Sequence, residues 1–598
     1  MAYRPPVREQ LFVLFDLLGI GNLSNLEGFS ELTPDLARQI LEEGARICAD
    51  KLAPLNAIGD KTGCKRGDDG SVSTPPGFAA AWRDFVAGGW PALSAAPRWG
   101  GQGLPAVLAL AFSEMSSSAN MAFSMYPGLT HGAYSAIVAG GSEAQQALYL
   151  PRLASGEWCG TMNLTEPQCG TDLGLLRTKA RPAADGAYEI SGEKIWISAG
   201  EHDLADNIVH LVLARIEGAP EGVRGISLFV VPKFLPGPDG RPGARNRLVC
   251  AGLEEKMGIH ANATCFMSYD GARGWLVGEE NRGLSLMFVM MNEARIGVGL
   301  QGLAQAEAAM QAAADFARER LQGRSLTGPK NAQGPADPII VHPDVRRMLM
   351  DARAILEGGR AFVYWTALKG DLARRHPDPA ARQAAEDLLG LMTPVAKAFL
   401  TDRGFAICSD AVQICGGAGY TEHLPVSQYL RDCRITLIYE GTNGVQALDL
   451  VGRKLAANGG RAVMGFFSEI DAFAEAAEAG ESQTELAPFV AALLRAKGEL
   501  QEASLWLMQN GPADPDNVGA ASVDYLHLMG LTALAYMWAQ MARAALAKIA
   551  VGETDPYFQA KLVTGRHFID KLLPETSLRL ARIKAGAASL MALPAEAF

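Results

Sequence analysis

The sequence predicts a multidomain, mainly helical protein with one central β domain. At 598 residues, the chain is too long for a single hydrophobic core. Apolar residues recur with helical spacing toward both ends, whereas alternating β-branched residues are confined to a central interval. We therefore expect an N-terminal helical domain (1–160), a β domain (161–284), a second helical domain (285–455) and a C-terminal helical extension (456–598).

The periodicity of individual segments supports each of these domains. PDLARQILEEGARICADKL and EAQQALYLPRLASGEW have helical spacing and precede residue 160. YEISGEKIWISAG, NIVHLVLARI and GISLFVVPKF alternate and are bounded by Gly, Pro and Asp, which predicts strands. Helical patterns return with MNEARIGVGLQGLAQAEAAMQ, and a Gly- and Pro-rich stretch at 323–344 predicts a surface loop. ANGG at 457–460 predicts a linker before the extension.

Composition excludes several classes of function. The formal net charge of −11 argues against a general grip on nucleic acid. Nine scattered cysteines without a CxxC pair predict neither a disulfide framework nor a zinc site, and they fit a reducing, cytoplasmic location. The histidines have no metal-ligand spacing, so no metal is expected. No strand-linked GxGxxG loop occurs, so a Rossmann NAD site is not expected.

Neither end of the chain predicts a membrane segment. The N-terminal apolar run is cut by Asp16 and has no small-residue cleavage site, so we expect no signal peptide. The apolar stretch at 528–547 is interrupted by Gln540 and Arg543 and is too short to span a bilayer. We therefore expect a packed helix there.

Four segments carry residue types suited to one flat, phosphate-bearing cofactor and an acid–base reaction. They are MNLTEPQCGTDLG (162–174), GEKIWISAG (192–200), QICGGAGYTEHLPVSQYLRDCRI (413–435) and IYEGTNGVQ (438–446). Hydroxyls suit the polar edge of a flavin, an indole suits its face, and glycines let backbone approach a pyrophosphate. Glu440 is a lone acid between an apolar run and a helix start, a costly position unless the carboxylate is used.

Together, in this order and spacing, the four segments resemble the acyl-CoA dehydrogenase family over about residues 40–455. The resemblance implies a helical N-terminal domain, a β-barrel or sandwich middle domain and a four-helix-bundle domain, with FAD held between the last two. The C-terminal extension resembles the large branch of the family, which includes very-long-chain and 3-methylmercaptopropionyl-CoA dehydrogenases. The implied FAD contacts are Met162, Leu164, Thr165, Thr171, Trp196, Ser198, Arg320, Gln413, Gly416, Gly417 and Thr442.

The same resemblance implies the chemistry. Glu440 would remove the α-proton of an acyl-CoA thioester, and flavin N5 would accept the β-hydrogen as hydride. Thr171, Glu440 and Gly441 would contact the thioester, and Arg295 would support the loop that carries the base. Two positions depart from the common pattern: Gly323 replaces an aromatic residue near Arg320, and Gly444 replaces a glutamine.

Simpler interpretations of these residues remain open in the sequence. Trp196 on an alternating strand is typical of a core residue, and TEP is typical of a turn with a cap. Glu440 could be a capping carboxylate, although Thr442 and Asn443 are better placed to cap. Arg295 could be a solvated charge on a helix.

Three function classes follow from the resemblance. The first is a dehydrogenase of lipid metabolism that passes electrons to an electron-transfer flavoprotein. The second is an acyl-CoA oxidase that uses oxygen. The third is a flavin-bearing relative that binds nucleic acid, which Glu440 and the acidic balance disfavour. Because Gln413 to Gly417 resemble a segment that meets FAD across a subunit interface, we also expect a homodimer.

Overall fold

The computed structural model describes residues 3–479 and 483–598, and these form two compact units. Unit 1 contains the chain up to Glu42, the segment Ala106–Glu114 and everything from Val298 onward. Unit 2 contains Glu43–Pro105 and Met115–Gly297. The segments predicted as the β domain and as the two later helical regions are strands and helices respectively, so the predicted fold class is confirmed.

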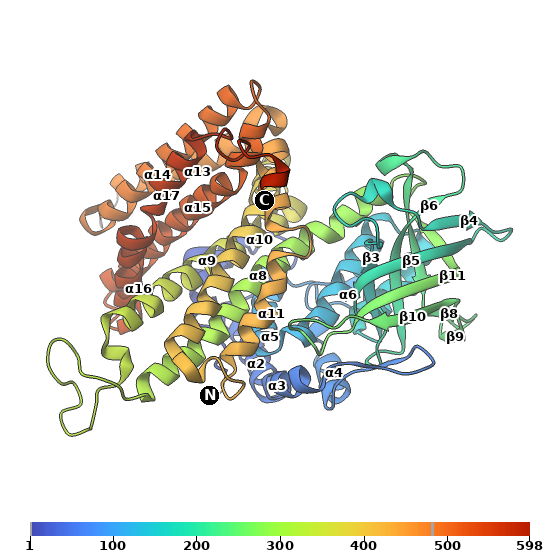
Figure 1. Ribbon diagram of the computed structural model, residues 1–598, viewed down its shortest axis with the longest axis horizontal. Helices are drawn as coiled ribbons and strands as arrows, with labels where there is room; N and C mark the ends of the chain where they lie inside the picture. Colours follow the sequence, from blue (N-terminus) through green and yellow to red (C-terminus); the bar gives the residue numbers. More distant parts are fainter. Residues whose placement is uncertain (1–2, 480–482) are drawn as a thin grey trace. The chain divides into compact units, whose positions relative to one another are not determined.

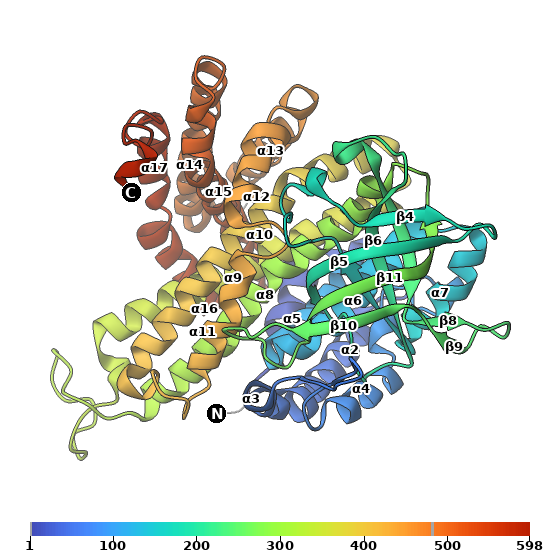
Figure 2. The ribbon, with the colours of Figure 1, turned by 45° about the vertical axis from the view of Figure 1, so that its right-hand side comes forward.

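Unit 2 is built around a seven-stranded sheet that closes on itself (Figures 1 and 2). Strands β11, β5, β4, β6 and β7 pair in a ring, because β7 bonds to both β6 and β11. Strands β10 and β3 extend the ring from β11 and β6. The bounds are β3 (Trp158–Asn163), β4 (Lys179–Pro182), β5 (Tyr188–Ser198), β6 (Asn207–Ile216), β7 (Ile226–Pro232), β10 (Leu248–Leu253) and β11 (Thr264–Val277).

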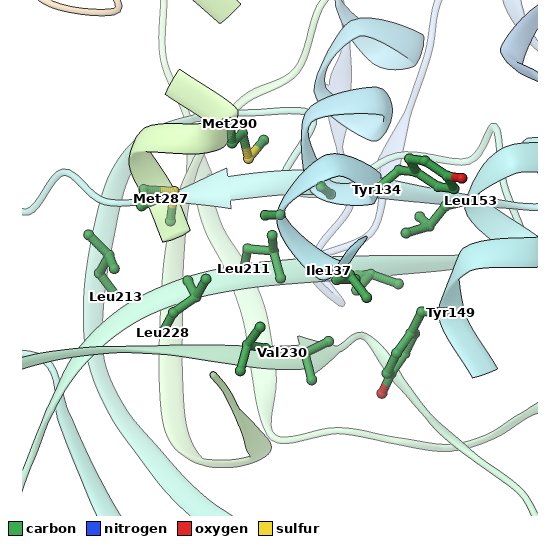
Figure 3. Close-up of a cluster of buried hydrophobic side chains, with 14 of the residues drawn as sticks. Tyr134, Ile137, Tyr149, Leu153, Leu211, Leu213, Leu228, Val230, Met287 and Met290 are labelled. Carbon is green, nitrogen blue, oxygen red and sulfur yellow. The ribbon is translucent and has the colours of Figure 1, made fainter. Parts of the chain in front are cut away.

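Alternation along β6 and β7 supplies two separate cores, one on each face of the sheet. Phe229 and Val231 belong to the cluster inside the ring, whereas Leu228 and Val230 belong to a cluster on its outer face. Because both faces are buried, these strands consist of nearly continuous apolar residues. Figure 3 shows the outer cluster, where Met287 and Met290 of helix α8 (Gly283–Glu319) lie against helix and strand residues.

Helices α6 (Met121–Gly140) and α7 (Glu143–Ser155) supply the other side of the outer cluster. Helix α7 begins with a complete capping box, in which Ser142 and Gln145 satisfy each other's backbone N–H groups. The remaining described helices and strands of unit 2 are α3 (Ala53–Thr62), α4 (Phe78–Ala87), β1 (Lys65–Arg66), β2 (Val72–Ser73), β8 (Phe234–Pro236) and β9 (Pro242–Arg245). Helices α2 (Pro34–Ile47) and α5 (Ala106–Ala119) contribute residues to both units.

Unit 1 is a helical bundle in which backbones approach closely. Gly302 of α8 faces Gly404 of α10 (Pro379–Cys415), and a Cβ at Gly404 would lie 2.3 Å from the carbonyl oxygen of Gly302. Helix α9 (Pro343–Arg375) packs along α10, and α11 (Val426–Arg434) and α12 (Asn443–Asp449) pack against α10 as well. The loop between Arg320 and His342 is exposed, as the Gly- and Pro-rich sequence predicted.

The C-terminal extension belongs to unit 1. Its helices are α13 (Arg461–Glu478), α14 (Gln483–Asn510), α15 (Asp516–Ala550), α16 (Pro556–His567) and α17 (Glu575–Lys584). Helix α15 is central, because α14, α16 and α17 all pack on it and it also contacts α9, α10 and α12. In both ribbon views the extension lies beside α9 and α10 (Figures 1 and 2).

Helix α15 corrects one step of the sequence argument. The apolar stretch at 528–547 is part of a helix of 35 residues, which is long and apolar enough to cross a membrane. The argument that it is too short was therefore wrong. However, 72% of its most apolar window is buried within the protein, which is typical of a core helix and agrees with the expected packing.

The nine cysteines are all free thiols, so no disulfide is formed.

Candidate active site

The predicted site residues fall into two sets. Unit 2 carries Met162, Leu164, Thr165, Thr171, Trp196, Ser198 and Arg295. Unit 1 carries Arg320, Gln413, Gly416, Gly417, Glu440, Gly441 and Thr442.

Trp196 lies at a β-bulge. In the pairing of β5 with β11, Ile197 is opposite Cys265 and Lys194 is opposite Met267, so Ile195 and Trp196 together face one residue. Trp196 has a φ of 58°, and its side chain is 62% exposed. A bulge redirects a side chain, and a left-handed conformation is costly for a tryptophan. This excludes the simpler interpretation of Trp196 as a core residue, and the indole is available to cover a flat ligand.

The loop after β3 is attached to the same bulge. Glu166 and Cys169 exchange backbone hydrogen bonds of 2.8 and 3.0 Å across a tight turn, so TEP does begin a turn. The N–H of Ile195, next to Trp196, donates to the carbonyl of Thr165 over 2.9 Å. Thr165 and Trp196 therefore belong to one rigid arrangement, which fits contacts to the edge and face of the same ring.

A buried ion pair lies beneath this arrangement. The Lys194 ammonium donates to Glu166 over 2.8 Å and to the Leu164 carbonyl over 2.9 Å, and its side chain is fully buried. Glu166 also accepts from the backbone N–H groups of Arg177 and Thr178 and from the Thr178 hydroxyl. One lysine thus fixes the Thr165 loop to the Trp196 strand.

The pair is charged at neutral pH. Burial raises the pKa of Glu166, but Lys194 and the hydrogen bonds outweigh it and hold that pKa at about 2. Burial lowers the pKa of Lys194 to about 8, which still leaves the ammonium protonated at pH 7.

The other predicted site residues of unit 2 lie on β3 and β5, in the loop after β3 and on α8. Met162 and Leu164 are half-buried against the outer cluster, and Thr171 is exposed. The Thr161 hydroxyl donates to the Ser198 carbonyl over 2.7 Å, which joins β3 to the end of β5. Arg295 is only 8% exposed and donates to the Asn292 side chain over 3.2 Å, which excludes the alternative of a solvated helix charge.

In unit 1, Glu440 lies in a tight loop before α12. Its φ is 58° and that of Gly441 is 85°, so two consecutive residues are left-handed. A Cβ at Gly441 would lie 2.7 Å from the Gln446 amide, which explains why this position is glycine. The apolar run before Glu440 begins with a 3-10 turn, Ile435–Leu437, and is only partly buried, because Ile438 is 47% exposed.

Thr442 is the N-cap of α12, because its hydroxyl accepts from the Val445 N–H. Glu440 is therefore not the capping carboxylate. The buried Gln446 donates to the Glu440 carbonyl over 3.0 Å and to the Gly441 carbonyl over 3.3 Å. The Tyr439 hydroxyl donates to Gln301. The strained loop is thus held from both sides, as a positioned functional group requires.

The end of α10 presents the third predicted segment. Helix α10 ends at Cys415, and Gly416 caps it with a φ of 58°. Gln413, Gly416 and Gly417 are exposed, and no atom lies within 4 Å of a Cβ built on either glycine. Backbone there is open to a phosphate-bearing group. Arg320 is also exposed, just beyond the end of α8.

Sequence reasoning missed the residues that hold the loops. Lys194 lies within GEKIWISAG and Glu166 within TEP, yet neither was assigned a role. Gln446 and Asn443 lie within IYEGTNGVQ, and their contacts become visible only in the folded loop. The usable signal was the alternation of the strand, which places Lys194 on the same face as the apolar Ile190 and so implies a buried partner for its charge.

Family models match almost the whole chain in four consecutive parts. Residues 35–157 match the acyl-CoA dehydrogenase N-terminal domain, 161–272 the middle domain and 281–455 the C-terminal domain. Residues 466–594 match a domain described as acetyl-CoA dehydrogenase C-terminal like. The 3-methylmercaptopropionyl-CoA dehydrogenase of Ruegeria pomeroyi is 45% identical over 584 residues, covering 98% of each chain. This chain belongs to the acyl-CoA dehydrogenase family.

Solved structures agree with this assignment. The structure of an acyl-CoA dehydrogenase from Bacillus anthracis in complex with FAD aligns with a TM-score of 0.73 and 21% identity. It covers 93% of this chain and 89% of its own, which shows the shared fold. A solved structure described as the electron transferring flavoprotein of Acidaminococcus fermentans is 27% identical to this chain, with a TM-score of 0.58. The alignment covers 72% of this chain and 99% of that one. The prediction of an enzyme of the acyl-CoA dehydrogenase class is confirmed.

Proposed function

We propose that this acyl-CoA dehydrogenase family member binds FAD and converts an acyl-CoA thioester to the trans-2-enoyl-CoA. Glu440 removes the α-proton. The observation that carries the proposal is the left-handed backbone conformation of Glu440. The carbonyl of this residue accepts a hydrogen bond from the buried Gln446 side chain, which holds the loop. A costly backbone conformation held by buried contacts is typical of a functional site.

The exposed groups of each unit fit FAD chemically. Unit 2 offers the indole of Trp196 for a ring face and the hydroxyls of Thr165, Thr171 and Ser198 for a polar edge. Unit 1 offers the open glycine backbone of Gly416 and Gly417 for a pyrophosphate. When bound, FAD supplies a two-electron oxidant whose N5 accepts the β-hydrogen as hydride.

The chain's own residues then have five tasks. The Glu440 carboxylate takes the proton from the α-carbon, and the adjacent backbone at Glu440 and Gly441 positions the thioester oxygen, on which enolate charge develops. Trp196 excludes water from the reacting face. Arg295 supports the active loop, and Arg320 and Thr442 contribute to the cofactor grip.

We propose an electron-transfer flavoprotein as the acceptor, in a cytoplasmic homodimer. The similarity to a solved structure described as an electron transferring flavoprotein supports such a flavoprotein as the electron acceptor. The oxidase alternative differs only in oxygen access to the reduced cofactor. The nucleic-acid-binding alternative is disfavoured by the net charge of −11. The 45% identity to a 3-methylmercaptopropionyl-CoA dehydrogenase supports a short thioether acyl group as the first substrate to test.

Anaerobic bleaching of the purified flavoprotein tests the proposal. The panel comprises 3-methylmercaptopropionyl-CoA, butyryl-CoA and a long straight-chain acyl-CoA, with free CoA as the control. We expect loss of the flavin absorbance with at least one acyl-CoA and none with CoA alone. A folded, FAD-loaded protein that none of a broad acyl-CoA panel bleaches would refute the dehydrogenase function.

A further inference from the structure

We infer that the C-terminal extension positions the Glu440 loop through a chain of hydrogen bonds from His527 by way of Asp402 to Asn443. This inference rests on the proposed role of Glu440 as the base. It gives the extension a part in the reaction, and makes His527 a positioning residue.

Asn443 is the anchor of the loop. It follows Thr442 directly and is the first residue of α12. Its side-chain oxygen accepts from the fully buried Lys397 over 2.7 Å. Its side-chain nitrogen donates to Asp402 over 2.7 Å and to the Thr401 hydroxyl over 2.9 Å. One amide therefore ties the loop to α10 at both of its polar ends, three residues from Glu440.

Asp402 is held in turn by the extension. The His527 Nε2 lies 2.9 Å from the second carboxylate oxygen of Asp402. A carboxylate can only accept, so Nε2 carries the proton. His527 is 6% exposed and belongs to α15. The two oxygens of Asp402 are thus divided between the base loop and the extension.

The packing around His527 fixes its ring. The ring of Phe399 on α10 meets it edge-to-face, with centroids 5.6 Å apart. Gly530, one turn further along α15, allows the close approach, because a Cβ there would lie 2.5 Å from the Phe399 ring. A change in the seating of α15 would therefore move the imidazole and, through Asp402, the Asn443 anchor.

A second contact of the extension provides a matched control. Arg403, next to Asp402, pairs with Glu575 of α17 over 2.7 Å and stacks on the Phe399 ring at 5.2 Å. This pair ties the extension to the same stretch of α10, and the other partner of Glu575 is Arg579 of its own helix. Glu575→Gln therefore removes one ion pair between the extension and α10 and leaves every hydrogen bond between His527, Asp402 and Asn443 in place.

The experiment compares His527→Phe, His527→Gln, Asn443→Ala and Glu575→Gln in the FAD-loaded full chain by anaerobic stopped flow. We expect His527→Phe to slow the limiting flavin reduction about 3- to 30-fold, below the roughly 10²-fold cost of a 1 Å misplacement. The acyl-CoA concentration that gives half the limiting rate should change by a smaller factor than the limiting rate of flavin reduction. His527→Gln keeps a donor and should recover much of the loss, and Glu575→Gln should reduce at close to the parent rate. His527→Phe combined with Asn443→Ala should cost less than the product of the two single effects.

A second readout does not depend on activity. Hydrogen exchange in residues 438–446 should accelerate in His527→Phe and not in Glu575→Gln. If parent protein fails to bleach, the proposed function fails while this exchange comparison still decides the coupling. Equal exchange in the two variants, or equal bleaching rates, would overturn the inference.

Discussion

Lys194 donates a 2.8 Å hydrogen bond to Glu166, and neither side chain is open to solvent. The lysine lies two residues before Trp196, and the glutamate directly follows Thr165. The pair therefore joins the two segments expected to meet the flavin ring. A buried pair of this kind is a weak source of net stability, but breaking it is costly because one charge stays buried and unpaired.

We expect Lys194→Met to lower the free energy of unfolding by about 3–5 kcal/mol and to weaken FAD binding. The methionine fills the space but leaves the Glu166 charge without its cation. Chemical denaturation and a flavin titration measure both effects. Arg181→Met, which breaks the exposed pair with Glu189, is the control and should leave both stability and FAD binding close to those of the parent. Equal effects of the two variants would contradict the assigned role.

The depressed pKa of Glu166, about 2, predicts an acid limit to stability. A carboxylate whose pKa is lower in the folded state contributes stability above its unfolded pKa of about 4.3, and this is lost as the pH falls toward the folded value. The difference in unfolding free energy between parent and Glu166→Gln should therefore narrow progressively as the pH falls from about 5 toward 2. Denaturation at a series of pH values measures the difference. A gap that does not narrow in acid would show that Glu166 is not the group responsible.

Glu440→Gln should fold, bind FAD and bind acyl-CoA, because the shape and backbone of the loop are kept. Anaerobic flavin reduction should fall by at least about 10²–10⁴-fold, the usual contribution of a positioned base. Glu440→Asp should keep some activity, since the carboxylate is only set back by one methylene. Glu422→Gln, an exposed residue, is the control. If Glu440→Gln bleaches at close to the parent rate, the base lies elsewhere.

Trp196→Ala should weaken FAD binding and increase the yield of hydrogen peroxide, because the exposed indole would no longer cover the cofactor. Trp196→Phe keeps an aromatic face and should remain closer to the parent. Turnover with an electron-transfer flavoprotein is compared with turnover in oxygen alone. If the unaltered enzyme turns over as fast with oxygen alone as with the flavoprotein, it is an oxidase.

We expect a homodimer in sedimentation velocity, with the end of α10 close to a partner's FAD. Gly417→Leu should then lower FAD affinity, although the side chain enters open space within its own chain. Gly452→Leu is the control, because Gly452 is also exposed with no atom within 4 Å of its Cβ. A monomer that retains FAD and activity would rule out a shared site. A tetramer would contradict the expected dimer but would leave the shared site possible.

The sequence by itself determined the order of helical and β regions and the family, because periodicity and the TEP and YEGT motifs are local patterns. It also placed Thr442 as the cap of α12, since capping depends on residues close in sequence. It could not show that Trp196 and Glu440 adopt left-handed conformations, because neither residue type prefers them. Those conformations are imposed by a register shift against β11 and by the Gln446 clamp.

The tertiary structure alone decided which residues support the site. Lys194 and Glu166 are 28 positions apart, and His527 and Asp402 are 125 apart, so no local pattern links them. Arg295 was equally compatible with solvent until the fold buried it. The same holds for α15. Its composition permits a membrane-spanning helix, and only packing within the bundle shows that its apolar surface is already covered.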